Sequence, residues 1–375
     1  MTDTKSQTWL EKLEEQLNVD VDWMNPDDIK KLPIVPHDQT SNQLWVDIEL
    51  DNPANAELIR ETARDLKDQG WLHIYTRVAV LLCKNNIDAI KERVLLQTLP
   101  SQAYDEQATI DHARLYDQEF RRVGISRKRY CIKIPATGPA LNAAKVLSQD
   151  KDADGLGIPT LGTAVFGLAQ AIASSQADML YISPYFNENR AHDDLSLWPD
   201  VEDPATQHPN SARVVQMLDT YRRLYKETGK PQPKMKLASF ISPKEALAAA
   251  EFGCHSATLS PRIIQELAKL EYDGTRQPGE GGIPKPQPDV EFYQADWPAP
   301  SRLQKLAGTD PLAAKDWDGK LASTEVDYLA NGGKEVEEAI RKDPISDSRL
   351  KEALKIFTAA EDRSRKRIED VLVAL

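Results

Sequence analysis

The sequence predicts an α/β protein, a (β/α)8 TIM barrel with an elaborated second βα connection and a helical C-terminal extension. From residue 90 to 270, short apolar runs alternate with longer amphipathic stretches, the pattern of repeated βα units around a parallel sheet. Six such units fit this segment, and two short strands upstream bring the number to eight. The 375 residues are enough for a barrel of about 250 residues with additions.

The predicted strands are short, and most are apolar. The first two lie upstream, and the second of them is the less regular. The eight ranges are 18–22, 40–42, 94–98, 130–135, 157–161, 179–183, 235–240 and 255–259.

The predicted helices carry apolar residues at spacings of three and four, and two of them open with proline, which suits the first helical turn. They cover 27–32, 140–147, 164–174, 211–228, 243–252 and 261–270. Residues 44–90 interrupt the series. There, 44–50 alternates like a strand, whereas 55–68 and 78–90 have helical spacing, and we interpret the whole as an elaborated second βα connection.

The C-terminal third differs in composition from the barrel segment. Residues 274–299 are rich in Pro, Gly and Gln, and helical periodicity returns at 326–342 and 347–374. We therefore expect a catalytic barrel over 1–272, and an irregular excursion with C-terminal helices that pack on the barrel over 273–375. The last helix could instead mediate assembly, which leaves a homo-oligomer open.

Composition excludes several classes of function. The net charge of −12, without a basic run interleaved with aromatics, argues against nucleic acid as a partner. No stretch approaches the ~20 apolar residues of a membrane span and the N-terminus has no apolar leader, so we expect no membrane partner and a cytoplasmic protein. Three distant cysteines, six scattered histidines and no glycine-rich nucleotide motif predict no metal and no cofactor.

One lysine stands out within a predicted strand. Alternation over 130–135 places Ile132 and Ile134 on one face, and Cys131 and Lys133 on the other. If the isoleucines face the helices, Lys133 points into the barrel, where loss of hydration lowers its pKa and leaves free amine to attack a carbonyl. The pattern also fits an exposed lysine at a strand end.

Polar residues lie at or just beyond the carboxyl ends of other predicted strands: Asp22, Gln97, Thr163, Ser183 and Tyr185. That face of a barrel is where active sites are assembled. A carboxylate and a nucleophilic lysine on different strands suit carbon–carbon bond cleavage, because an iminium accepts the electrons while the acid or base handles the hydroxyl proton. Each residue alone fits a cap, a turn or a core position equally well.

Six motifs in order resemble one known family: DQTSN at 38–42, IKIPAT at 132–137, GIPTLGTAVF at 157–166, ISPYFN at 182–187, LASF at 237–240 and LSP at 259–261. The chain resembles the transaldolase family of class I Schiff-base aldolases over roughly residues 18–270. The central motif is most similar to the fructose-6-phosphate aldolase branch.

The resemblance implies that Lys133 on strand four forms the Schiff base. The family's strand-one aspartate falls on Asp22 and its strand-two asparagine on Asn42. The proline and serine that follow this asparagine in the family are replaced by Gln43 and Leu44.

The residues that distinguish the two branches also have counterparts. Transaldolases carry a glutamate on strand three and an asparagine on strand five, which fall here on Gln97 and Leu161. Fructose-6-phosphate aldolases hold a catalytic water with glutamine, threonine and tyrosine, and these fall on Gln97, Thr163 and Tyr185. The resemblance therefore implies aldolase-like proton chemistry.

The expected phosphate contacts depart from the family. Its arginine after strand six falls on Glu188, and its basic residue after strand seven falls on Ile241, while Ser239 is retained. Arg190 is close enough in sequence to Glu188 to be a substitute. Together with Asn42 and Ser183, the residues Glu188, Arg190 and Ser239 form the predicted substrate-binding set.

Three functional hypotheses follow. The first is a transaldolase-like Schiff-base aldolase for a ketose or hydroxyketone donor and an aldehyde acceptor, with weakened phosphate recognition. The second is an ordinary transaldolase of the pentose phosphate pathway, which transfers dihydroxyacetone between sugar phosphates. The third is a barrel that has lost catalysis, against which the retained Lys133 and Asp22 argue.

Overall fold

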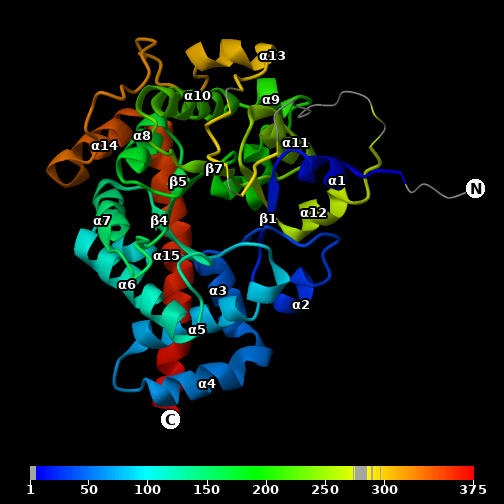
Figure 1. The fold of residues 1–375 in the computed structure, drawn as a ribbon. Coiled ribbons are helices and arrows are strands. Elements are labelled where there is room, and N and C mark those ends of the chain that lie inside the picture. The colour runs from blue at the N-terminus through cyan, green and yellow to red at the C-terminus, as the bar shows by residue number, and fades with distance from the viewer. Residues whose placement is uncertain (1–5, 273, 275–284, 289, 296) are drawn as a thin grey trace, which may run out of the picture.

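A closed barrel of parallel strands forms the centre of the computed structural model, which describes residues 6–272, 274, 285–288, 290–295 and 297–375 (Figure 1). The strands follow one another around the barrel in sequence order, and β8 closes it by pairing with β1. They are β1 Asn18–Asp22, β2 Gln39–Thr40, β3 Val94–Gln97, β4 Tyr130–Pro135, β5 Thr160–Val165, β6 Tyr181–Pro184, β7 Lys234–Leu237 and β8 Ser256–Leu259. The predicted (β/α)8 barrel is confirmed.

Helices fill the connections and surround the barrel. The α-helices are α1 Trp9–Glu14, α2 Pro26–Ile29, α3 Gln43–Asp51, α4 Ala56–Asp65, α5 Trp71–Lys84, α6 Glu106–Arg122, α7 Gly138–Gln149, α8 Leu168–Gln176, α9 Pro204–Gln207, α10 Ser211–Thr228, α11 Pro243–Phe252, α12 Pro261–Leu267, α13 Ser301–Gln304, α14 Ala330–Lys342 and α15 Pro344–Val373. Short 3-10 helices are η1 Pro53–Asn55, η2 Ile87–Ala89, η3 Pro100–Gln102, η4 Asn189–His192, η5 Leu195–Leu197 and η6 Lys305–Gly308.

Strand β4 shows how side-chain alternation builds the two layers of the core. Ile132 and Ile134 belong to the large core between strands and helices. Cys131 belongs to a separate small cluster, which it forms with Leu95, Leu161 and Tyr181 of the neighbouring strands. Because Lys133 shares the face of Cys131, it points into the barrel, as the alternation predicted.

Two local predictions were wrong, and one helix was missed. Residues 44–50, which alternate like a strand, lie in α3, where the side chain of Asn42 accepts a hydrogen bond from the Leu44 amide at 2.9 Å and caps the helix. Strand β5 begins and ends later than predicted, because a bulge between Thr163 and Val165 carries the strand through Ala164. Helix α6 was not predicted.

The C-terminal helix α15 packs across the carboxyl-terminal end of the barrel (Figure 1). It contacts α3, α5, β5 and η4 along its length. Three ion pairs fix it to α3: Arg363 pairs with Asp47 at 2.7 Å, and Arg367 pairs with both Asp47 and Asp51. The division of the chain at residue 272 stays a prediction.

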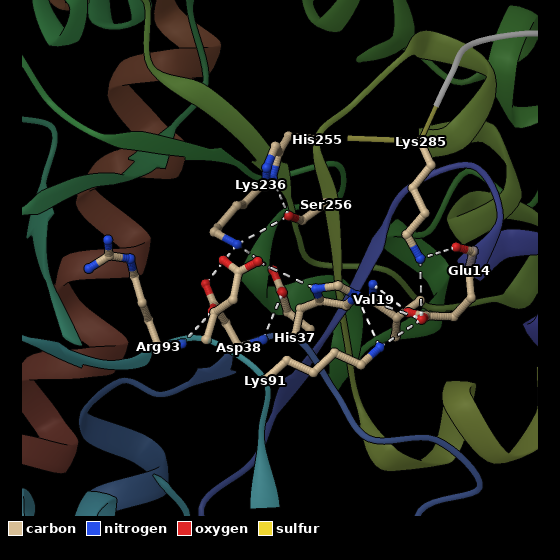
Figure 2. Close-up of polar contacts among 12 residues, drawn as sticks. Glu14, Val19, His37, Asp38, Lys91, Arg93, Lys236, His255, Ser256 and Lys285 are labelled. Carbon is tan, nitrogen blue, oxygen red and sulfur yellow. Dashed lines mark hydrogen bonds and ion pairs between the residues drawn. The ribbon is translucent and has the colours of Figure 1, made fainter. Parts of the chain in front are cut away.

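A network of buried charges fills the amino-terminal end of the barrel (Figure 2). The Lys236 ammonium lies 2.9 Å from Asp20 and 2.8 Å from Asp38, and it donates to the Ser256 hydroxyl at 3.1 Å. The side chains of Lys236, Asp20 and Asp38 are at most 1% exposed. This end of a barrel is associated with stability rather than catalysis, so we assign the network a structural role.

None of the helices in the described part of the chain combines the length and apolar character needed to cross a membrane.

Candidate active site

A cavity of about 1130 Å³ opens at the carboxyl-terminal end of the barrel. Five of the ten predicted site residues line it: Asp22, Asn42, Lys133, Tyr185 and Ser239. The other five do not line it: Gln97, Thr163, Ser183, Glu188 and Arg190. The volume is slightly above the usual range of small-molecule sites, and the position at the strand ends is the usual one for an active site in this fold.

Lys133 is the buried amine of this cavity, with 5% of its surface exposed. Burial lowers its pKa, and the opposing effect of the Asp22 carboxylate is smaller. Within the described residues, no carboxylate lies within 4.0 Å of its ammonium group. A lysine with a lowered pKa holds more free amine than an exposed lysine does at the same pH, and the free amine is the form that attacks a carbonyl.

Asp22 ends β1 on the wall of the same cavity. The Thr40 hydroxyl at the end of β2 donates to its Oδ1 at 2.6 Å, which fixes the orientation of the carboxylate. Its second oxygen is available to exchange a proton with a bound molecule.

Tyr185 follows β6, and its hydroxyl lies 3.1 Å from that of Thr163 on β5. Phe166 packs edge-on against the Tyr185 ring at 5.6 Å between centroids. Burial raises the pKa of Tyr185 well above its usual value, so the phenol stays protonated and can donate a hydrogen bond. Ser183 is paired in register with Thr163 and is buried.

Gln97 ends β3 and is 2% exposed, yet neither atom of its side-chain amide has a hydrogen-bond partner among the described residues. A buried amide in this state is suited to hold a water molecule or a substrate atom. Its main-chain carbonyl, by contrast, is fixed, since Gln43 donates to it at 2.9 Å and to the next carbonyl, that of Thr98, at 3.0 Å.

Gln43 is a positioning residue that the sequence reasoning missed. It was noted only as a departure from the family motif after Asn42. Its side chain joins the start of α3 to the end of β3 by a hydrogen bond, which a proline at this position could not make.

Other residue types occupy the two positions where the family has basic, phosphate-binding residues. Glu188 pairs with Arg349 of α15 at 3.7 Å, and Ile241 lines the cavity with its apolar side chain. Arg190 is exposed and lies outside the cavity lining. Its role as a substitute cation stays a prediction.

The retained Ser239 is bound by two neighbours. Its hydroxyl donates to the main-chain carbonyl of Asn187 at 2.8 Å, and His192 lies 2.9 Å from the same hydroxyl. Ser239 has a φ of +66°, which is uncommon outside glycine, and the amide group of the Asn187 side chain holds its carbonyl at 2.9 Å.

Other residues of the lining were not found by sequence reasoning. An aromatic wall is formed by Trp23 and Trp45, whose rings meet edge-on at 4.8 Å. Ile356 and Phe357 of α15 reach the cavity as well, and Arg262 lines it beside Ile241. The periodicity of α15 predicted the helix but could not show which side of it meets the cavity.

A metal site is not apparent in the part of the chain that the structure describes, since no three His, Cys, Asp or Glu side chains there form a group that could hold an ion.

Comparisons with known proteins show the family of the chain. Residues 20–291 match the family model described as Transaldolase/Fructose-6-phosphate aldolase. A transaldolase of Synechocystis sp. is 28% identical over 75% of this chain and 68% of its own length. Those of Prochlorococcus marinus and Haemophilus influenzae are 27% and 28% identical, over 77% and 80% of this chain and 84% and 93% of their own lengths.

Among solved structures, an IMP dehydrogenase/GMP reductase-like protein of Corynebacterium glutamicum is matched with a TM-score of 0.39, at 11% identity over 71% of each chain. That score is too low to support an argument. The family match and the curated relatives identify an enzyme of the aldolase and transaldolase type. The chain belongs to the transaldolase/fructose-6-phosphate aldolase family.

Proposed function

We propose that the protein is a transaldolase-like aldolase that forms a Schiff base between Lys133 and a ketose or hydroxyketone. The observation that carries the proposal is the buried Lys133 amine, which no carboxylate among the described residues neutralises and which opens on the same cavity as Asp22. A charged lysine is costly to bury, so its presence at this position is best explained by chemistry that uses the neutral amine.

The steps follow from the residues present. The Lys133 amine adds to the ketone carbonyl of the donor, and loss of water gives an iminium. Asp22 then accepts the proton of the hydroxyl two carbons from the iminium carbon, the carbon–carbon bond breaks, an aldehyde leaves, and the electron pair moves to the iminium to form an enamine. The enamine either attacks an acceptor aldehyde or takes a proton, after which water hydrolyses the iminium and frees Lys133.

Protonation of the enamine is the step that separates an aldolase from a transaldolase. Gln97 ends β3, Thr163 lies within β5, and Tyr185 directly follows β6. The unsatisfied Gln97 amide and the hydrogen-bonded pair of hydroxyls support a shared water that delivers this proton. On this basis the protein acts as an aldolase of the fructose-6-phosphate aldolase branch.

Weakened phosphate recognition is the second part of the proposal. The cavity lining carries four carboxylates, on Asp22, Asp28, Asp193 and Glu266, and three basic side chains, on Lys31, Lys133 and Arg262. Lys133 is needed as neutral amine, and Arg262 is paired with Glu266 at 2.7 Å. This balance disfavours a phosphate dianion.

An ordinary transaldolase is the alternative, and Arg262 is the observation that favours it. Its guanidinium donates to the main-chain carbonyl of Ile241 at 2.7 Å, so a cation lies beside the position where the family has a basic residue. Exchange of Glu266 for a phosphate as its partner would restore an anion site.

Borohydride reduction separates these readings. The protein is incubated with dihydroxyacetone or with fructose 6-phosphate, reduced, and analysed by intact mass and peptide mapping. An adduct on Lys133 with dihydroxyacetone alone supports an aldolase for an unphosphorylated donor, and adducts with both restore the ordinary transaldolase. Absence of any adduct contradicts the proposal.

Replacing Tyr185 by phenylalanine is expected to slow aldol cleavage by about 10²-fold or more, because it removes the phenol that donates to the shared water. Iminium formation on Lys133 does not need this group, so borohydride trapping persists. The two rates are compared in the same preparation. Loss of trapping together with turnover would show that Tyr185 acts earlier than proposed.

A further inference from the structure

His192 is a residue of the cavity that contacts the retained Ser239. It ends η4, is exposed, and lines the cavity together with Ser239 and Lys133. Its Nε2 lies 2.9 Å from the Ser239 hydroxyl oxygen. The expected anion contact of Ser239 is therefore occupied by a side chain of the protein.

The direction of this hydrogen bond follows from the other contact of Ser239. The serine hydroxyl has one proton, and the carbonyl of Asn187 at 2.8 Å can only accept it. The Ser239 oxygen must then accept from His192, so Nε2 carries the proton. In the neutral ring, Nδ1 is left with a lone pair, which is not used in a hydrogen bond to any of the described residues.

The serine is held rigidly enough to impose this state on the histidine. The main-chain amide of Asn187 donates to the Ser239 carbonyl at 3.2 Å, and the amide of its side chain donates to the same carbonyl at 2.9 Å. The Asn187 side chain is itself fixed by Glu245 at 3.0 Å and His208 at 3.1 Å. If the serine hydroxyl rotated away from Asn187, the hydrogen bond from this hydroxyl to the Asn187 main-chain carbonyl would be lost.

The charges that act on His192 come from three elements. Asp22 of β1 and the adjacent Asp193 favour the protonated ring, whereas Arg262 of α12 disfavours it. Although the side chain is exposed to the cavity, the surrounding protein still reduces the hydration of the ring, and this loss of hydration outweighs all three charges and lowers the pKa of His192 below its usual value. The ring is therefore neutral at pH 7, with its lone pair as the group offered to a ligand.

We propose that His192, locked by Ser239, forms a subsite for a hydroxyl group at the far end of an unphosphorylated ketose donor, with Nδ1 as the acceptor. The proposal rests on the proposed function and names the substrate class of that site. A neutral acceptor fits a hydroxyl, which donates, and rejects a phosphate dianion, which can only accept.

The same geometry makes the preference depend on pH. When the ring is protonated, Nδ1 becomes a donor and carries positive charge, so it can bind a phosphate group. The ratio of kcat/KM for fructose 6-phosphate to kcat/KM for fructose should then rise as the pH falls through the lowered pKa of His192.

The ratio is measured from pH 8 to pH 5 for the full-length protein, for His192→Gln and for His73→Gln, a control histidine on α5 away from the cavity. We expect a rise of about tenfold in the native protein and the control, the factor by which a charge-assisted hydrogen bond exceeds a neutral one. His192→Gln should show only the change due to titration of the substrate phosphate, which all three proteins share.

Equal slopes in the native protein and in His192→Gln would overturn the subsite. So would ¹⁵N spectra of labelled histidine that place the proton of His192 on Nδ1 at pH 7.5. Borohydride trapping on Lys133, run in parallel, tells this failure from that of the proposed function, because trapping persists if only the subsite is wrong.

Discussion

Replacement of Lys133 by methionine is expected to lower kcat/KM for any ketose donor by on the order of 10⁴-fold or more, because the variant has no amine to form the iminium. Methionine is of similar length and is apolar, so the barrel interior stays filled. The measurement is aldol cleavage together with borohydride trapping, and both should be lost.

The same variant should lose activity without losing stability. Burial lowers the pKa of Lys133, so between the folded-state pKa and about 10.4 the unfolded chain binds more protons than the native one. The lysine therefore destabilises the fold below its folded-state pKa, and this cost disappears as the pH rises through the window. We expect Lys133→Met to have a free energy of unfolding equal to or above that of the native protein at pH 7. An inactive but destabilised variant would assign Lys133 a structural role.

The fold was predictable where one periodicity governs a segment. The spacing in 211–228 and 243–252 matched α10 and α11, each of which ends at a glycine with positive φ, Gly229 and Gly253. Strand β4 was matched as well. The prediction failed at α3 and β5, where a side-chain cap from Asn42 and a bulge at Ala164 override the local pattern.

The site was predictable to the extent that it lies on strands. Lys133 could be placed by alternation and Asp22 by its position at the end of a predicted strand, since the carboxyl ends of parallel strands meet at one face. His192 and Arg262 could not, because loop and helix-end residues have no periodicity that fixes their direction. The pair of Glu188 and Arg349 joins residues far apart in sequence, and no local signal announces it.

The charge network at the other end of the barrel was also beyond sequence reasoning. Lys234 and Lys236 alternate with Met235 and Leu237, a pattern typical of a strand with one face in solvent. In the closed barrel that face is the interior. Lys236 is 1% exposed. Its charge is balanced by Asp20, which lies in β1, and by Asp38, which directly precedes β2.

Replacement of Lys236 by methionine is accordingly expected to lower the free energy of unfolding by about 3–5 kcal/mol, since it leaves two carboxylates buried without a cation. Chemical denaturation monitored by circular dichroism measures the loss. Lys234→Met, on the same strand but half-buried and not within 4.0 Å of a described carboxylate, is the matched control and should change stability far less.

The pH dependence identifies charge rather than packing as the cause. Burial raises the pKa of Asp20, so the native protein holds a proton that the unfolded chain has lost, and stability falls as the pH rises above the ordinary carboxyl range. Without Lys236 this effect grows, so Lys236→Met should lose more stability at pH 8 than at pH 5. Adding Asp20→Asn and Asp38→Asn should recover much of the loss, because neutral amides retain the acceptor oxygens for the main-chain amides of Asp38 and Arg93. If the triple variant is no more stable than Lys236→Met, the lysine acts through its packing, and the buried charges are not what holds this end of the barrel together.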